Sequence, residues 1–144
     1  MTDNTEGEFN TAVGYKSLEN NTSADHNVAM GYQALGGNTT GIYNTAVGSL
    51  ALDANTTANN NTGLGYAALG ANTTGADNTS VGANALQTNT TAHFNSAFGQ
   101  AALAQNTTGA SNSAFGQGSL RANTTGASKY CCWRGLFGCK YYSK

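Results

Sequence analysis

Proline is absent from this 144-residue chain, charged side chains make up only 9% of it, and long apolar runs are missing. No stretch approaches the roughly 18 apolar residues of a membrane span, and no basic segment with an apolar run behind it marks a signal peptide. Residues 1–128 carry seven acidic side chains against Lys16 and Arg121, which leaves no basic patch for nucleic acid. We therefore expect neither membrane insertion nor a nucleic-acid partner.

The chain is built from Asn, Thr, Gly and Ala in a tandem repeat of 17 residues. Seven copies fill residues 10–128 without an insertion or deletion, and residues 1–9 are the back half of a preceding copy. The consensus is N-T-A-V-G-x-x-A-L-x-x-N-T-T-G-x-x, and its places are called positions 1 to 17 from here on. Position 4 is always apolar, position 5 always Gly and position 9 always Leu, whereas positions 3 and 8 hold only Ala, Gly or Ser.

A repeat of this length is too short for a pair of helices and suits one coil of a β-solenoid. T-A-V-G predicts a short strand and x-A-L a second one. N-T-T-G predicts a turn in which Asn and Gly tolerate positive φ. The predicted fold is all-β, a parallel β-solenoid or β-roll of about seven coils, with positions 4 and 9 as its core. Stacking would form amide ladders from Asn at positions 1 and 12, and a Thr column at position 13.

Each coil offers only two sizeable apolar side chains, which is little burial to offset the ordering of a whole coil. The small residues at positions 3 and 8 predict that coils approach other coils closely. We therefore expect self-association, as a homotrimer or an end-to-end filament. A closed monomeric solenoid with Val and Leu inside is the alternative.

The sequence changes character at residue 129, where an eighth copy should begin. Residues 129–144 hold all three cysteines, the only tryptophan and four of the six Lys and Arg residues. Back-translated with a shift of one base, this tail can spell NTAVG in phase with the array, so we interpret it as an eighth repeat read in the wrong frame. A disulfide knot between chains and a metal site are the alternatives, although the cysteine spacing fits neither a CxxC pair nor a usual zinc pattern.

No combination of reactive side chains recurs from copy to copy. His26 and His93 fall at variable turn positions. A calcium-binding roll would need Asp in every turn, and a phosphate loop would need a helix after its glycines. We expect no enzyme activity and no catalytic, cofactor-binding or metal site. The acids within the repeats are scattered: Glu19, Asp25, Asp53 and Asp77.

The stretch NTAVGYKSLENNTSADHNVAMGYQALGGNTTGIYNTAVG resembles repeat arrays in the tail-fibre shafts of bacteriophages and other large DNA viruses, and in related bacterial surface proteins. It is also similar to the head repeats of trimeric autotransporter adhesins, whose shorter repeat forms a left-handed parallel β-roll. The resemblance covers residues 3–128 and departs from the adhesins in its period. It implies a structural shaft segment of an extracellular or virion fibre, with a cell-surface glycan or receptor as a candidate ligand.

Two other functions remain open. Stacked Thr columns, such as Thr39, Thr56 and Thr73, also resemble some antifreeze repeats and would fit an ice-binding solenoid. Against this, N-T-T places its threonines side by side in a turn, where only one of each pair can face outward. The second alternative is the head fragment of a cell-envelope adhesin.

Overall fold

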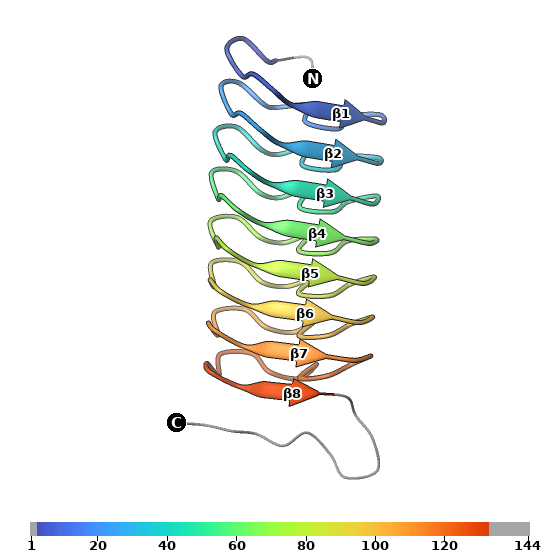
Figure 1. Cartoon of the computed structure of the whole chain (residues 1–144), viewed down its shortest axis with the longest axis vertical. Helices are drawn as coiled ribbons and strands as arrows, with labels where there is room; N and C mark the ends of the chain where they lie inside the picture. The colour runs from blue at the N-terminus through green and yellow to red at the C-terminus, as the bar shows by residue number, and fades with distance from the viewer. Residues whose placement is uncertain (1–2, 133–144) are drawn as a thin grey trace.

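A computed structural model describes residues 3–132, which form one parallel β-solenoid of about seven coils with 17 residues per coil (Figure 1). The described residues contain no helix, so the predicted fold class is confirmed. A single sheet runs along the rod in the order β1 to β8, and each residue pairs with the one 17 places later, as Ala12 does with Ala29. The strands are Thr11–Val13 (β1), Val28–Met30 (β2), Thr45–Val47 (β3), Thr62–Leu64 (β4), Thr79–Val81 (β5), Ser96–Phe98 (β6), Ser113–Phe115 (β7) and Tyr130–Cys132 (β8).

Each coil contains one strand, and the second strand predicted at x-A-L is wrong. Positions 7 and 9 adopt left-handed backbone conformations, with φ of 54° at Gln33 and 51° at Leu35. A chain that alternates into this region cannot run as an extended strand. The segment still bonds to its neighbour, because the Leu35 N–H donates to the Ala51 carbonyl at 3.0 Å.

The core consists of Leu at position 9 packed against small residues at positions 3 and 8. The prediction that position 4 lies inside is wrong: Val13 is 53% exposed and Met30 42% exposed. Alternate residues of a strand point to opposite faces, and the burial of position 3 turns positions 2 and 4 outward. A Cβ on Gly63 would lie 3.3 Å from Leu52 Cγ, so the coil is thin enough that position 3 must be small.

The burial of positions 3 and 8 also removes one argument for close contact between chains. Ala29 and Ala34 are fully buried within a single chain, where they face the interior of their own solenoid. Their small size is therefore explained by the thin core and gives no support to a trimer.

Buried Asn residues at position 12 form the predicted amide ladder. Each Nδ2 donates to the Oδ1 of the Asn one coil earlier, at 2.8 to 3.3 Å, in an unbroken column from Asn4 to Asn123. The same Nδ2 donates to the carbonyl three residues later, as Asn72 does to Gly75 at 2.8 Å, which closes the N-T-T-G turn. The ladder therefore ties each coil to the next and fixes the turn within the coil.

Asn at position 1 is also buried and stacked, but most of its bonds differ from the prediction. Oδ1 of Asn44 accepts the backbone N–H of Asn61 at 3.0 Å, and Nδ2 of Asn44 reaches across the coil to the Ala58 carbonyl at 2.8 Å. That carbonyl also accepts from Asn55 Nδ2 at 3.0 Å, so both Asn columns meet on one acceptor. Among the described residues, no buried side-chain nitrogen or oxygen lacks a hydrogen-bond partner.

The Thr column at position 13 stacks as predicted, with each hydroxyl donating to the carbonyl of the next Thr, for example Thr39 to Thr56 at 3.0 Å. The positive φ predicted for the N-T-T-G turn is wrong, because the left-handed residues lie at positions 5, 7, 9 and 17 instead. Gly48 at position 5 has φ of 135°, and a Cβ there would lie 2.5 Å from the Gly65 carbonyl oxygen. Glycine is thus required at position 5 by both conformation and space.

The first residues of the tail continue the solenoid. The Lys129 N–H donates to Asn112 Oδ1 at 3.0 Å, and Cys131 pairs with Ala114 as the next position 3 would. Cys131 is buried and Cys132 is an exposed free thiol. The rest of the tail lies outside the described residues, so the frame-shift interpretation stays a prediction that the nucleotide sequence can test.

Candidate functional site

The reactive side chains identified in the sequence lie on the surface and bond to neighbouring coils. The His26 ring stacks between those of Phe9 and Tyr43, with centroids 4.9 and 5.1 Å away. Nδ1 of His93 accepts the backbone N–H of Ala76 at 2.9 Å. Both imidazoles therefore connect adjacent coils at the edge of the rod.

The four acids of the repeats are also apart from one another. Glu19 forms an ion pair with Lys16 at 3.3 Å, and Asp77 accepts from Asn60 Nδ2 at 3.1 Å. Asp25 accepts the Glu8 N–H at 2.6 Å. Within residues 3–132, no three His, Cys, Asp or Glu side chains gather where they could hold a metal ion.

The Asp53 carboxyl, at position 10 of the third copy, is partly buried. Burial raises the pKa of Asp53 above its ordinary value, because the charged form loses water, while hydrogen bonds from the Asp53 and Ala54 backbone N–H groups oppose the shift. The fold therefore favours the protonated form of this carboxyl over the charged form.

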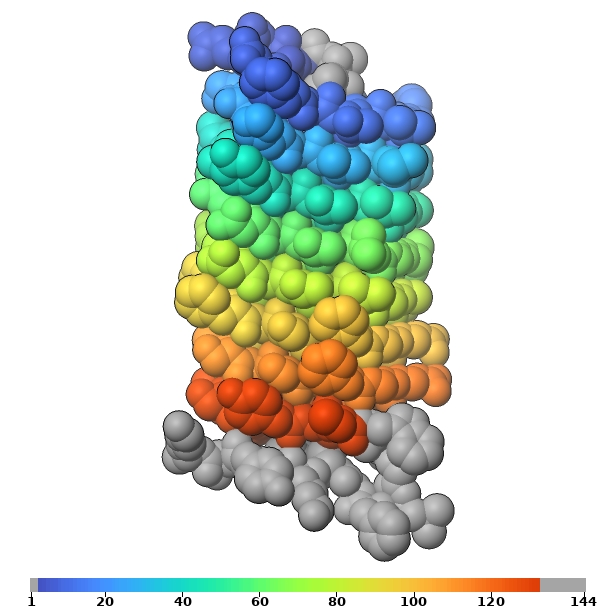
Figure 2. Space-filling view, in the orientation of Figure 1, coloured from blue at the N-terminus to red at the C-terminus, as the bar shows by residue number. Residues whose placement is uncertain are grey.

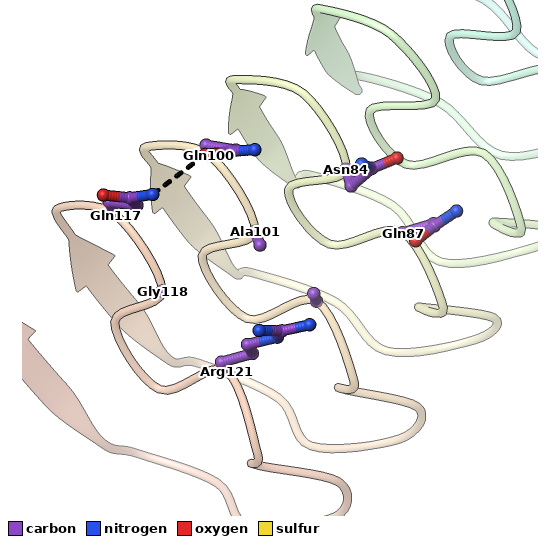
Figure 3. Close-up of a pocket in the computed structure, with 8 residues that line it drawn as sticks. Asn84, Gln87, Gln100, Ala101, Gln117, Gly118 and Arg121 are labelled. Atoms are coloured by element: carbon purple, nitrogen blue, oxygen red, sulfur yellow. Dashed lines mark hydrogen bonds between the residues drawn. The ribbon is translucent and has the colours of Figure 1, made fainter.

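A shallow groove of about 630 Å³ runs along the last three complete coils (Figure 3). Gln100 and Gln117 lie along one side and are joined by a hydrogen bond of 3.0 Å, and Gln87 and Arg121 lie along the other. The remaining lining residues are small or neutral: Asn84, Ala101, Ala104 and Gly118.

The groove is open at its middle because positions 7 and 10 of the sixth copy are both alanine, Ala101 and Ala104. In the first coil the same two positions hold Lys16 and Glu19, whose ion pair occupies the corresponding place. The groove presents amides, which both donate and accept hydrogen bonds, and one guanidinium, but no acid or nucleophile. It can bind hydroxyl-rich or carboxylate groups. The sequence alone does not show this groove, because its lining comes from positions 6, 7 and 10 of three separate copies.

The two threonines of each N-T-T turn differ in their surroundings and form two separate rows along the rod. At position 13 the hydroxyls donate to carbonyls of the next coil and are partly buried along most of the rod. At position 14 the side chains, such as Thr57 and Thr74, are exposed. One exposed row per turn agrees with the expectation that only one of each pair faces outward.

Comparisons of the chain with protein-family models, with curated proteins and with solved structures find no match. The described residues contain no helix long and apolar enough to span a membrane. The fold defines the class of protein, a parallel β-solenoid of about seven turns.

Proposed function

We propose that this chain is a structural shaft segment of an extracellular or virion fibre. The observation that carries the proposal is the unbroken repetition of one coil-to-coil contact, seen most clearly in the amide ladder from Asn4 to Asn123. No coil within this span carries an insertion, and the side chains line up in rows from coil to coil (Figure 2). Such an architecture serves as a spacer of defined length.

A rod of this kind resists bending because each coil is bonded to the next around its circumference. The sheet supplies one set of bonds, the Asn and Thr columns supply others, and the x-A-L turn supplies a further one. At a rung spacing of about 4.8 Å, eight stacked strands span roughly 34 Å. Further coils would lengthen the rod without changing any contact already made, which is the property a fibre shaft needs.

Immunogold electron microscopy tests the shaft role. Antibodies raised against the purified full chain are applied to intact virions or cells of the source. The proposal predicts label along thin projections at the particle or cell surface. Label confined to the cell interior would contradict it.

The groove supports a second, compatible role in adhesion to a cell-surface glycan. Its four amides and Arg121 suit hydroxyl groups, and an acidic sugar would pair with the guanidinium. Binding of the full chain to a glycan array, repeated with Arg121→Ala, tests this role. Lys16→Ala is the matched control, because it removes a cation outside the groove. Adhesion through the groove predicts binding that Arg121→Ala alone weakens, and no binding to any glycan would exclude it.

Ice binding and a cell-envelope adhesin are the competing assignments. Position 13 has its hydroxyls committed to coil-to-coil bonds, so the N-T-T turns present one exposed Thr row rather than a double rank. We therefore expect no thermal hysteresis from the purified chain, and measurable activity would overturn the shaft proposal in favour of ice binding. An anchoring segment encoded downstream in the restored frame would instead favour the adhesin.

A further inference from the structure

One side of the rod collects the exposed apolar side chains. Positions 2 and 4 point outward from the strands, and positions 17 and 6 border them before and after each strand; we call the surface of these four positions the sheet face. Figure 2 shows it as rows of side chains running down the rod. Every large apolar side chain that is exposed in the described structure lies on it: Phe9, Val13, Tyr15, Met30, Tyr32, Tyr43, Val47, Tyr66, Phe94, Phe115 and Tyr130.

Charge is nearly absent from the same surface. Among positions 17, 2, 4 and 6 of the seven copies, Asp77 is the one acidic residue, and no Lys or Arg occurs there. The acids and cations of the repeats otherwise fall at positions 7, 10 and 16. Position 4 supplies an apolar side chain in every copy, beside a position 2 that is Thr or Ser in all copies but one. Soluble monomers rarely expose large apolar patches, and Tyr, Phe and Met are enriched where proteins meet. The sheet face therefore has the composition of an interface.

The area of the sheet face is close to the area that one protein partner buries in a standard interface. Eight strands at about 4.8 Å and seven residues at about 3.3 Å give a surface of roughly 34 by 20 Å, near 700 Å². A standard stable interface buries about 800 Å² on each partner. One partner that covered the sheet face along its full length would thus form an interface of ordinary size.

We propose that this partner is a second copy of the chain, and that two rods pack through their sheet faces about a two-fold axis. The side chains of the sheet face repeat at every rung, and only another array with the same rung spacing can stay in register with them over eight strands. Two nearly uncharged faces also meet without repulsion between like charges. The face is a flat run of parallel strands, so a pair covers it fully, whereas three rods around an axis would leave a gap between flat faces.

Analytical ultracentrifugation of the full chain over a concentration series tests the pairing. Reductant is included, because Cys132 is an exposed thiol that could link chains. The proposal predicts a dimer of twice the 14.7 kDa chain mass. Val47→Lys places a charge in the middle of the sheet face and is expected to weaken the dimer roughly 100-fold or more, because two unpaired charges become buried. Thr57→Lys is the matched control, an exposed site in the same coil but outside the sheet face.

A second, milder variant keeps the test valid if Val47→Lys misfolds. Circular dichroism checks the fold of each protein. Tyr32→Ser introduces the residue that Ser49 already provides at the same position. It is expected to weaken the dimer about 10-fold or more, as the loss of a buried interface tyrosine does. A dimer lost in both sheet-face variants and kept in Thr57→Lys supports the proposal. A monomeric parent chain, a trimer, or a dimer equally stable in all variants would overturn it.

Discussion

Replacing Asn72 with Ala removes one rung of the position 12 ladder and should destabilise the rod strongly. The side chain makes three bonds: Nδ2 donates to Asn55 Oδ1 at 3.0 Å and to the Gly75 carbonyl at 2.8 Å, and Oδ1 accepts from Asn89 Nδ2 at 3.0 Å. The Gly75 carbonyl keeps its bond from Asn61, and Asn89 keeps its bond to the Ala92 carbonyl. Asn55 Oδ1 has no other hydrogen bond and would be left buried without a partner.

The magnitude follows from what each group loses. An orphaned buried acceptor costs about 1–3 kcal/mol, and each of the other two lost bonds about 1 kcal/mol, so the free energy of unfolding should fall by about 3–5 kcal/mol. Urea unfolding followed by circular dichroism measures it, with Thr74→Ala as the control, because Thr74 is an exposed residue of the same turn. A loss below about 1 kcal/mol, the level expected for the surface control, would refute the ladder as a source of stability.

Three further predictions separate the inside of the coil from the outside. Leu69→Ala removes a fully buried side chain and should lower the free energy of unfolding by about 2–5 kcal/mol. Val47→Ala changes the outward position 4 and should lower the same free energy by about 1 kcal/mol or less. Equal losses in the two variants would contradict the assigned core. Gly65→Ala should cost at least about 2 kcal/mol, because φ is 129° and the new Cβ would lie 2.7 Å from a backbone carbon of the next coil. Gly118→Ala, with φ of 63° and open space, should cost only about 1–2 kcal/mol by the same denaturation assay. The pKa of Asp53 is raised in the folded state, so its negative charge destabilises the fold above that pKa but not below the unfolded value of 3.8. Asp53→Asn should therefore exceed the parent chain in free energy of unfolding at high pH, by an amount that shrinks as the pH falls through this window. A difference in free energy that stays constant with pH would be inconsistent with burial of the carboxyl.

The repeat period predicted the solenoid, because seven copies in strict phase can bury a continuous core only by stacking. The identities at positions 9 and 12 predicted the Leu column and the amide ladder for the same reason. Position 4 was wrongly predicted to lie in the core because it is apolar in every copy. Its side chains range from Val to Phe along one array, and a close-packed interior does not accept such a change of volume without rearrangement. That variation in size was the available sign that position 4 faces outward.

The second predicted strand, at x-A-L, does not form, and no residue type in this segment indicates why. Leu35 and its copies lie at φ near 50°, a conformation that side chains like Leu rarely adopt. The surrounding coils hold it there, because the Leu then points into the core and its N–H bonds to the next coil. The groove depends on this turn geometry, because its residues at positions 7 and 10 flank the turn, and the sequence alone does not show that they lie together.

The central claim is that consecutive 17-residue coils stack in one parallel register. Scalar couplings across hydrogen bonds, measured by NMR on the isotope-labelled full chain, test it most directly, because they identify donor and acceptor by residue. The structure predicts coupling from the Gly65 amide nitrogen to the Val47 carbonyl carbon and from Leu69 to Ala85, through bonds of 2.8 and 3.0 Å. Couplings from these amides to carbonyls three or four residues earlier, as in a helix, or to any other coil position, would contradict it.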